Sequence, residues 1–241
     1  MSLMMMGAGP AIPGGSTPWS PEEMSGYVDS PYSIAHLRSI GALFQDLNEE
    51  IPAVDDLDPV RVIVCGSRRY TAPSDAARVL LWDEGDGEWS LSFDGADDTF
   101  EDFNTGSPAG LFSWHLMRSS LQGYFALYEN ASSEVAVRID SDGRVEPDFD
   151  IWYSGSSPYV TDGEPYTIFV WRSDTDPTTM WVNNELLIGD TVAKTIPATL
   201  SLFPTDSDVA PFPGRISSFG FATAKPDTAT LAKLQSYITG A

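Results

Sequence analysis

The chain has 241 residues, 42% of them hydrophobic and 12% aromatic, which is enough for one large all-β domain or a domain with an appendage. Thirteen Lys and Arg stand against 35 Asp and Glu, and the resulting charge of −22 argues against nucleic acid or an anionic membrane as a partner. A single cysteine permits no disulfide within the chain and, with only two histidines, no closed Cys/His zinc site.

The first 20 residues are rich in Met, Gly, Ala and Pro and have no periodic pattern. They lack the basic and apolar regions of a signal peptide, and no stretch approaches the ~18 apolar residues of a membrane-spanning helix. We expect a protein made in the cytoplasm and not inserted into a membrane. Residues 1–32 are expected to form an arm that anchors the chain to a particle or to other copies.

Residues 33–54 form a leader that contains one short predicted helix. Ser33 is a suitable N-cap, and Ile34, Leu37 and Ile40 are spaced to share one helical face, so the helix is expected to run from Ser33 to Leu43.

About a dozen short runs with alternating apolar residues follow, separated by turn-forming residues. This texture predicts an antiparallel sandwich or barrel. Asp142-Gly143 and Asn183-Asn184 have the chemistry of tight hairpin turns. The predicted strands are 60–64, 78–82, 89–93, 111–116, 123–128, 134–139, 149–153, 166–172, 179–182, 186–188, 199–203 and 216–221.

The chain closes with a predicted amphipathic helix. Pro226 and Asp227 or Thr228 begin it, and Gly240 ends it. Leu231, Leu234 and Ile238 line one face, which must pack on the sandwich.

Two segments near the C-terminus resemble the end of concanavalin A-like (laminin G-like) jelly-roll domains. There, a strand of the form W-x-N-G-x precedes a segment F-x-G-x-I and a terminal helix. Here the first part is Trp181-Val182-Asn183-Asn184-Glu185, and the second begins at Phe212-Pro213-Gly214-Arg215-Ile216. The resemblance implies an all-β, concanavalin A-like jelly-roll sandwich at residues 55–241, with an N-terminal extended arm and a C-terminal helix.

The leader carries a second resemblance. Residues 39–46, 51–54 and 58–60 are similar to the leader that precedes such jelly rolls in many bacteriophage and prophage virion proteins, with Leu57 and Arg61 where that leader has Gly. The resemblance implies a virion structural protein, such as a fibre, spike or decoration subunit. Its partners would be other virion proteins bound through the arm, and further copies in a homo-oligomer.

The stretch Trp82-Asp83-Glu84-Gly85-Asp86-Gly87-Glu88-Trp89 spells Glu-x-Asp-x-Glu, the catalytic pattern of a large class of β-glucan hydrolases. On a strand, Glu84, Asp86 and Glu88 would share one face. The two glycines favour a turn instead, and alternation restarts at Trp89. We therefore expect a hairpin with Glu84 to Gly87 at a water-exposed tip. The sequence also lacks the motifs of nucleophilic catalysis, and we expect no enzymatic activity.

The best candidate for glycan binding is the loop 150–163. It combines aromatic rings with polar groups, as sugar sites do, and its candidate residues are Trp152, Tyr153, Tyr159 and Asp162. The alternative is that these rings fill the core, as most aromatic residues of a sandwich do. Trp82, Trp89, Trp114, Trp171 and Trp181 are assigned to the core or to sheet faces.

Calcium is the one candidate cofactor. Asp140 with Asp142, and Asp206 with Asp208, supply oxygen ligands on loops, as do Asp97-Asp98 with Glu101-Asp102. None of these groups matches the 12-residue EF-hand loop, and acidic residues also cluster by chance in so acidic a chain.

The leading functional hypothesis is a virion component that touches host surface polysaccharide, in which many copies turn weak binding at each site into avidity. The alternative is a carbohydrate-active enzyme or a free lectin of the concanavalin A-like superfamily.

Overall fold

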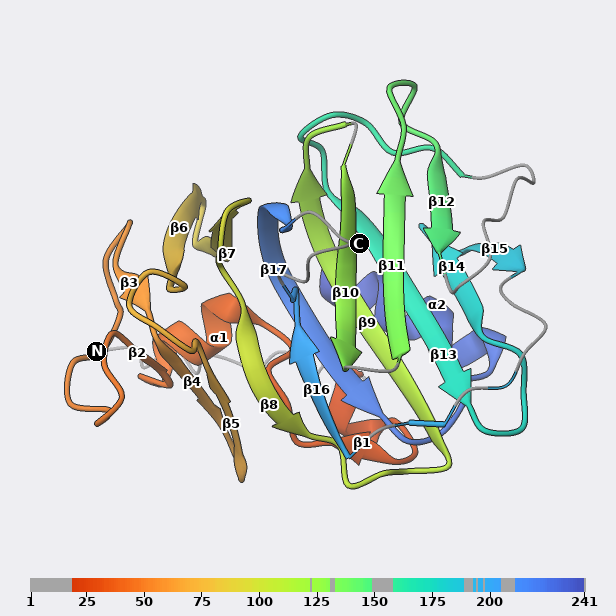
Figure 1. Cartoon of the computed structure of the whole chain (residues 1–241), viewed down its shortest axis with the longest axis horizontal. Helices are drawn as coiled ribbons and strands as arrows, with labels where there is room; N and C mark the ends of the chain where they lie inside the picture. The colour runs from red at the N-terminus through yellow and green to blue at the C-terminus, as the bar shows by residue number, and fades with distance from the viewer. Residues whose placement is uncertain are drawn as a thin grey trace, which may run out of the picture.

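The computed structural model describes residues 19–121, 123–130, 133–148, 158–188, 193, 195–196, 198–204 and 211–240. Two antiparallel β-sheets lie face to face, and a C-terminal helix covers the outer side of one of them (Figure 1). The predicted all-β sandwich with a terminal helix is confirmed.

The first sheet has the strand order β15-β14-β13-β9-β17-β7-β6-β3, and β1 also pairs with β17. Its strands are β1 (Tyr27–Val28), β3 (Pro59–Val60), β6 (Val79–Gly85), β7 (Glu88–Asp94), β9 (Gly110–Ser119), β13 (Tyr166–Ser173), β14 (Thr179–Val182), β15 (Glu185–Ile188) and β17 (Pro213–Ala222).

The second sheet has the order β12-β11-β10-β16-β8-β5-β4-β2. Its strands are β2 (Leu43–Phe44), β4 (Val62–Cys65), β5 (Arg68–Thr71), β8 (Phe100–Asn104), β10 (Tyr124–Asn130), β11 (Ser133–Ile139), β12 (Val145–Asp148) and β16 (Thr199–Leu202). The helices are a 3-10 turn η1 (Pro21–Glu23), α1 (Ile34–Ser39) and α2 (Thr228–Thr239).

Aromatic side chains fill the space between the sheets. Phe93 and Phe125 pack edge-on against Phe212, with ring centroids 5.5 and 4.7 Å apart, and Phe93 lies 5.0 Å from Phe203. All four rings are buried. Edge-to-face packing at these separations adds to the stabilisation that burial alone provides.

A second apolar cluster lies on the outer face of the first sheet, under α2. Phe112 and Trp114 of β9 and Phe169 of β13 pack there against helix residues. The helix residues are the predicted Leu231, Leu234 and Ile238. Because β9 and β13 are buried on both faces, their sequences run almost continuously apolar and do not alternate.

Both helix starts follow the predicted capping chemistry. The Ser33 hydroxyl accepts a hydrogen bond from the amide of His36, and the Asp227 carboxylate accepts one from the amide of Thr230. Gly240 ends α2 in the left-handed conformation, with φ of 70°. The first helix is shorter than predicted, however, since it ends at Ser39. Ile40 is 60% exposed and does not join the buried face, because the chain turns away there.

The two turns expected from their chemistry are confirmed. Asn183 and Asn184 both have positive φ, 47° and 66°, and join β14 to β15 as a two-residue hairpin. Gly143, with φ of 84°, lies in the turn between β11 and β12.

Other parts of the strand prediction need correction. The run 60–64 is two strands, since β3 pairs in the first sheet and β4 in the second, with Arg61 between them. The sequence pattern did not predict β1, β2, β5, β8 and β12, and the predicted strand 149–153 lies outside the described residues.

The described part of the N-terminal region adds strands to both sheets. β1 pairs with β17, and β2 pairs with β4. The division into an arm (1–32), a leader (33–54) and a jelly roll (55–241) stays a prediction. Among the residues that the structure describes, no helix has the length and apolar character needed to span a membrane.

His115 gives the fold a measurable sensitivity to acid. It lies on β9, and neither of its ring nitrogens has a hydrogen-bond partner among the described residues. Burial lowers its pKa from 6.5 to about 3. The unfolded chain takes up a proton near pH 6.5 whereas the folded chain does not until about pH 3, so acidification over this range favours unfolding.

We expect this histidine to cost about 2 kcal/mol of stability between pH 7 and pH 5. Denaturant unfolding of the protein and of His115→Leu at both pH values measures it. The variant should lose about 2 kcal/mol less on acidification than the unaltered protein, and an equal loss in both would contradict the assignment.

Candidate functional site

The hairpin of the Glu-x-Asp-x-Glu stretch is confirmed, but its tip is shorter than predicted. β6 extends to Gly85 and β7 begins at Glu88, so Asp86 and Gly87 alone join the strands. Gly85, Asp86 and Gly87 all have positive φ, at 86°, 53° and 86°. Glu84 therefore belongs to the strand, and the expectation that it is exposed at the tip is wrong.

The alternation of β6 places Glu84 on the outer face of the first sheet. Val79 and Leu81 lie in the core between the sheets, so Leu80, Trp82 and Glu84 lie on the opposite side. Arg118 shares this outer face, because Trp114 and Leu116 of the same strand pack under α2. Arg215 lies directly opposite Arg118 in the register of β17 and β9.

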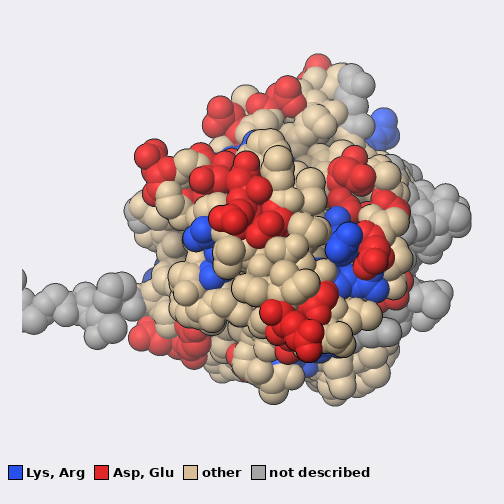
Figure 2. All heavy atoms as spheres, turned by 90° about the vertical axis from the view of Figure 1, so that its left-hand side faces the viewer, with Lys and Arg blue, Asp and Glu red and all other residues tan. Residues whose placement is uncertain are grey.

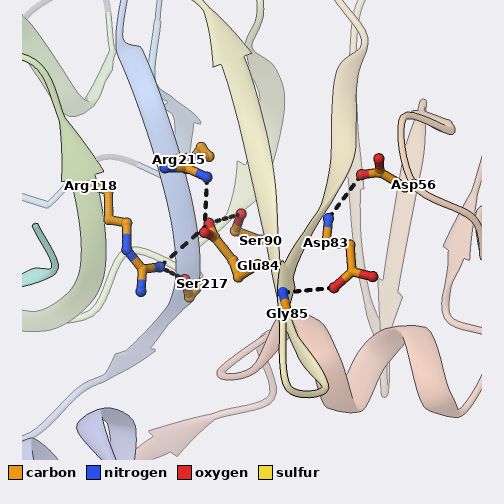
Figure 3. A network of polar contacts seen from close by, with 8 residues as sticks. All are labelled: Asp56, Asp83, Glu84, Gly85, Ser90, Arg118, Arg215 and Ser217. Atoms are coloured by element: carbon orange, nitrogen blue, oxygen red, sulfur yellow. Dashed lines mark hydrogen bonds and ion pairs between the residues drawn. The ribbon is translucent and has the colours of Figure 1, made fainter. Parts of the chain in front are cut away.

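Figure 3 shows how three strands converge on the Glu84 carboxylate. Arg215 Nη1 lies 2.8 Å from Oε2 and Arg118 Nη1 lies 3.4 Å from Oε1. The hydroxyl of Ser90 donates a hydrogen bond of 2.7 Å to Oε1, and Arg118 reaches Ser217 Oγ at 3.4 Å. The Glu84 side chain is only 10% exposed, so this network is a fixed feature of the sheet surface.

An exposed indole lies beside this network. Trp82 is 36% exposed, and the guanidinium carbon of Arg215 is 5.3 Å from its ring centroid, within range of a cation–π interaction. The same arginine thus positions both the Glu84 carboxylate and the Trp82 ring.

A cavity of about 570 Å³ adjoins the network on the side of α2. Arg118 and Ser217 belong to its wall, and they are joined by polar groups of β13 and α2. Thr167 Oγ1 donates a 2.6 Å hydrogen bond to Gln235 Oε1, and the Thr167 amide donates one of 2.9 Å to Asn183 Oδ1. Tyr32 and Tyr237 add aromatic edges. We call Trp82, Glu84, Arg118, Arg215, Ser217 and Gln235, with this cavity, the outer-face site.

The outer-face site has the features of a small-molecule site. It is concave, it presents polar groups held in place by hydrogen bonds, and it has aromatic surface at its edges. Fixed guanidinium, hydroxyl and amide groups match ligands with many hydroxyls.

Only residues 158–163 of the predicted glycan loop are described, and none of them lines the cavity. Trp152 and Tyr153 fall outside the described residues. Tyr159 is 60% exposed and forms an isolated β-bridge with Arg144, and its hydroxyl raises the pKa of that guanidinium. Asp162 accepts a 3.2 Å hydrogen bond from the Leu121 amide. Neither Tyr159 nor Asp162 lines the cavity of the outer-face site.

The calcium candidates are only partly described. Asp140 Oδ1 accepts hydrogen bonds from the amides of Asp142 and Arg144, both 2.9 Å long, and Asp206 and Asp208 lie outside the described residues. The structure brings Asp97 and Asp98 together with Asp94, and their oxygens lie within 4.8 Å of one another.

Asp98 is a buried acidic residue. Its burial raises its pKa to about 6, and its Oδ2 accepts a 2.7 Å hydrogen bond from the Asp94 amide. Glu101 and Asp102 follow on β8, and the side chain of Asp102 lies outside the described part. Calcium binding stays a prediction.

Sequence reasoning missed the outer-face site. Arg118 and Arg215 occupy outward positions of two long strands, and such arginines in otherwise apolar strands indicate an acidic partner on the same face. The sequence does not show that β9 pairs with β17, about a hundred residues further along the chain. This pairing brings Arg118 and Arg215 together at Glu84.

Comparison with known proteins gives a fold and no family. No protein-family model matches the chain, and no curated protein matches its sequence. Sialidase from Trypanosoma rangeli, in complex with a difluorinated nononic acid, has a similar structure, with a TM-score of 0.54 and 9% identity over 73% of this chain and 31% of the sialidase.

An arabinofuranosidase complexed with arabinofuranosyl-α-1,2-xylobiose is also similar, with a TM-score of 0.53 and 10% identity over 75% of this chain and 50% of the enzyme. The likeness thus spans less than a third of the sialidase and half of the arabinofuranosidase. The chain is a β-sandwich of concanavalin A-like type, and it shares this fold with carbohydrate-active proteins.

These likenesses correct the expectation that the chain is not an enzyme. The structures that share its fold include sialidases and an arabinofuranosidase, which are enzymes. At such low identity the likeness is one of fold alone. At the level of the fold it contradicts the expectation of no enzymatic activity, which was drawn from missing nucleophile motifs.

We expect Glu84→Gln to destabilise the protein by about 1–2 kcal/mol, because it leaves two half-buried guanidiniums without their anion. Urea unfolding measures this change. Glu88→Gln, at an exposed position of the same hairpin, is the matched control and should shift stability by less than about 0.5 kcal/mol. Equal effects in the two variants would show that the network contributes nothing.

Proposed function

We propose that the chain is a carbohydrate-binding β-sandwich module and that the outer-face site holds the sugar. The observation that carries the proposal is the cavity of about 570 Å³ with Arg118, Ser217 and Gln235 in its wall, which the Glu84 network joins to Arg215 and, through it, to the exposed indole of Trp82. The sugar complexes of the two similar enzymes add support from the fold.

The chemistry of the site suits a saccharide. Sugar hydroxyls both donate and accept hydrogen bonds, and the site offers guanidinium and amide donors together with hydroxyl and carbonyl acceptors. The apolar face of a sugar ring packs on an aromatic surface, which Tyr32 and Tyr237 supply in the cavity wall. Because Glu84 fixes Arg118 and Arg215 in advance, little side-chain entropy is lost on binding.

Glycan-array binding followed by calorimetry tests the site. Tyr237→Ala and Gln235→Ala, both in the cavity wall, should each weaken binding about tenfold. Tyr159→Ala is the control, because it removes an exposed aromatic ring that lies outside the cavity. Loss of binding in Tyr159→Ala alone would move the site to the loop 150–163. No binding of any glycan would overturn the proposal.

Catalysis is the second candidate function, and the similar enzymes favour it. Incubation of the protein with the glycan that it binds distinguishes catalysis from binding alone. Released sugar that depends on protein concentration and is lost in Arg118→Gln would assign hydrolysis to the outer-face site. An intact glycan after prolonged incubation supports a binding module.

We also propose that this module is a virion component, in which many copies present the outer-face site to host polysaccharide. The leader resemblance at residues 39–60 supports this, and the charge of −22 suits a protein displayed at high density without aggregation. Binding to other virion proteins through residues 1–32 belongs to the same proposal.

Multi-angle light scattering and electron microscopy test this assembly. The full chain should form a homo-oligomer or decorate particles from its source, and removal of residues 1–18 should abolish that association. A monodisperse monomer that never associates with particles would refute the virion proposal and leave the carbohydrate site untouched.

A further inference from the structure

Large apolar side chains gather on the leader. Ten large hydrophobic residues are exposed in the part of the chain that the structure describes, and five of them lie between residues 40 and 57. These five are between 37% and 60% exposed: Ile40, Leu47, Ile51, Val54 and Leu57. We call residues 40–58 the leader surface. It belongs to the end of the sandwich formed by α1 and β2 to β6, which faces the viewer in Figure 2.

The leader surface is ordered before any partner arrives. Asp46 accepts hydrogen bonds of 2.9–3.1 Å from the amides of Asn48, Glu50 and Ile51, which hold its pKa below the usual range. Asp58 accepts bonds of 2.9 Å from the amides of Val54 and Asp55. Two rigid turns therefore present the apolar side chains, and such preorganisation lowers the entropic cost of binding.

Leu57 gives an independent indication that these side chains serve a contact. Its φ is 66°, in the left-handed region, which costs a leucine about 1 kcal/mol relative to glycine. The Leu57 amide donates a 2.7 Å hydrogen bond to the Leu81 carbonyl, but the side chain is 51% exposed, so side-chain packing does not offset that cost. Backbone strain of this kind concentrates at binding sites.

The charge around the leader surface indicates what charge its partner should carry. Residues 40–58 contain six acidic residues and no Lys or Arg. Nearby arginines are bound within the chain: Arg38 Nε donates to the Val54 carbonyl at 2.7 Å, and Arg69 pairs with Glu49 at 2.8 Å. Figure 2 shows several acidic groups around uncharged surface on this face, with fewer basic groups beside them. A second copy would bring like charges together.

We propose that the leader surface docks a different protein, whose contact surface has apolar side chains flanked by Lys or Arg. Exposed apolar residues supply the buried centre of such an interface and the acidic residues its rim. The proposal is independent of carbohydrate binding, because it uses no residue of the outer-face site.

The test uses the full chain and a synthetic amphipathic peptide of about 18 residues, with leucines on one face and lysines on the other. Fluorescence anisotropy should show saturable binding. Leu57→Gly removes the side chain and its strain, so it should weaken binding about tenfold without loss of stability. Leu186→Ser is the matched control, because Leu186 is 59% exposed on β15 and should bind unchanged.

Two further peptides make the result decisive. Replacing lysine by glutamate, or leucine by serine, should abolish binding, since the surface requires both chemistries. Equal binding by Leu57→Gly, or undiminished binding of the serine peptide, would overturn the proposal. Sedimentation that shows a dimer of the full chain, lost in Leu57→Gly, would assign the surface to a second copy and also overturn it.

Discussion

The packing of α2 on the outer face of the first sheet is the contact on which the rest of the molecule depends. It buries β9 and β13 on both sides, so Trp114 and Phe169 can lie outside the sandwich core and still be shielded from water. A glycine is required opposite the indole, since a Cβ on Gly220 would come within 2.1 Å of the Trp114 ring. The helix covers only part of the sheet, and where its C-terminal end stops a cavity remains, walled by Gln235 and Arg118. The same helix therefore stabilises the fold and creates the edge at which a ligand can bind.

Beyond the helix, the outer face is polar because Glu84, Arg118 and Arg215 satisfy one another. An ion pair on an open surface contributes little, because water screens it and the side chains lose entropy. Here one carboxylate is shared by two arginines from neighbouring strands and a serine hydroxyl, and its side chain is nearly buried. The network links β6, β7, β9 and β17, so it also fixes the register of the hairpin against the centre of the sheet.

The sequence predicted the fold well where local chemistry decides the structure. Ser33, Asp227, Gly240 and Asn183-Asn184 each act as caps or turns for reasons contained in a few residues. Prediction failed where distant pairing decides. The glycines beside Glu84 predict an exposed tip, but Glu84 lies on the sheet, where it forms ion pairs with two arginines from distant parts of the chain. Likewise, Arg61 marks a change of sheet that no local pattern signals. The candidate site was missed for the same reason, since its named residues come from four separate elements, β6, β9, β17 and α2.

The outer-face site and the leader surface would bind their partners through different interactions. In the outer-face site Arg118 and Arg215 already pair with Glu84, so a ligand must compete by matching hydrogen bonds. The leader surface carries six acidic residues, one of which, Glu49, pairs with Arg69, so the remaining negative charge steers a basic partner toward it and apolar contact retains it. A chain of charge −22 repels its own copies at most orientations, and this repulsion disfavours self-association through the leader surface but does not act on an uncharged sugar. The distribution of charge thus favours a sugar at the outer-face site and a basic protein at the leader surface of the same sandwich.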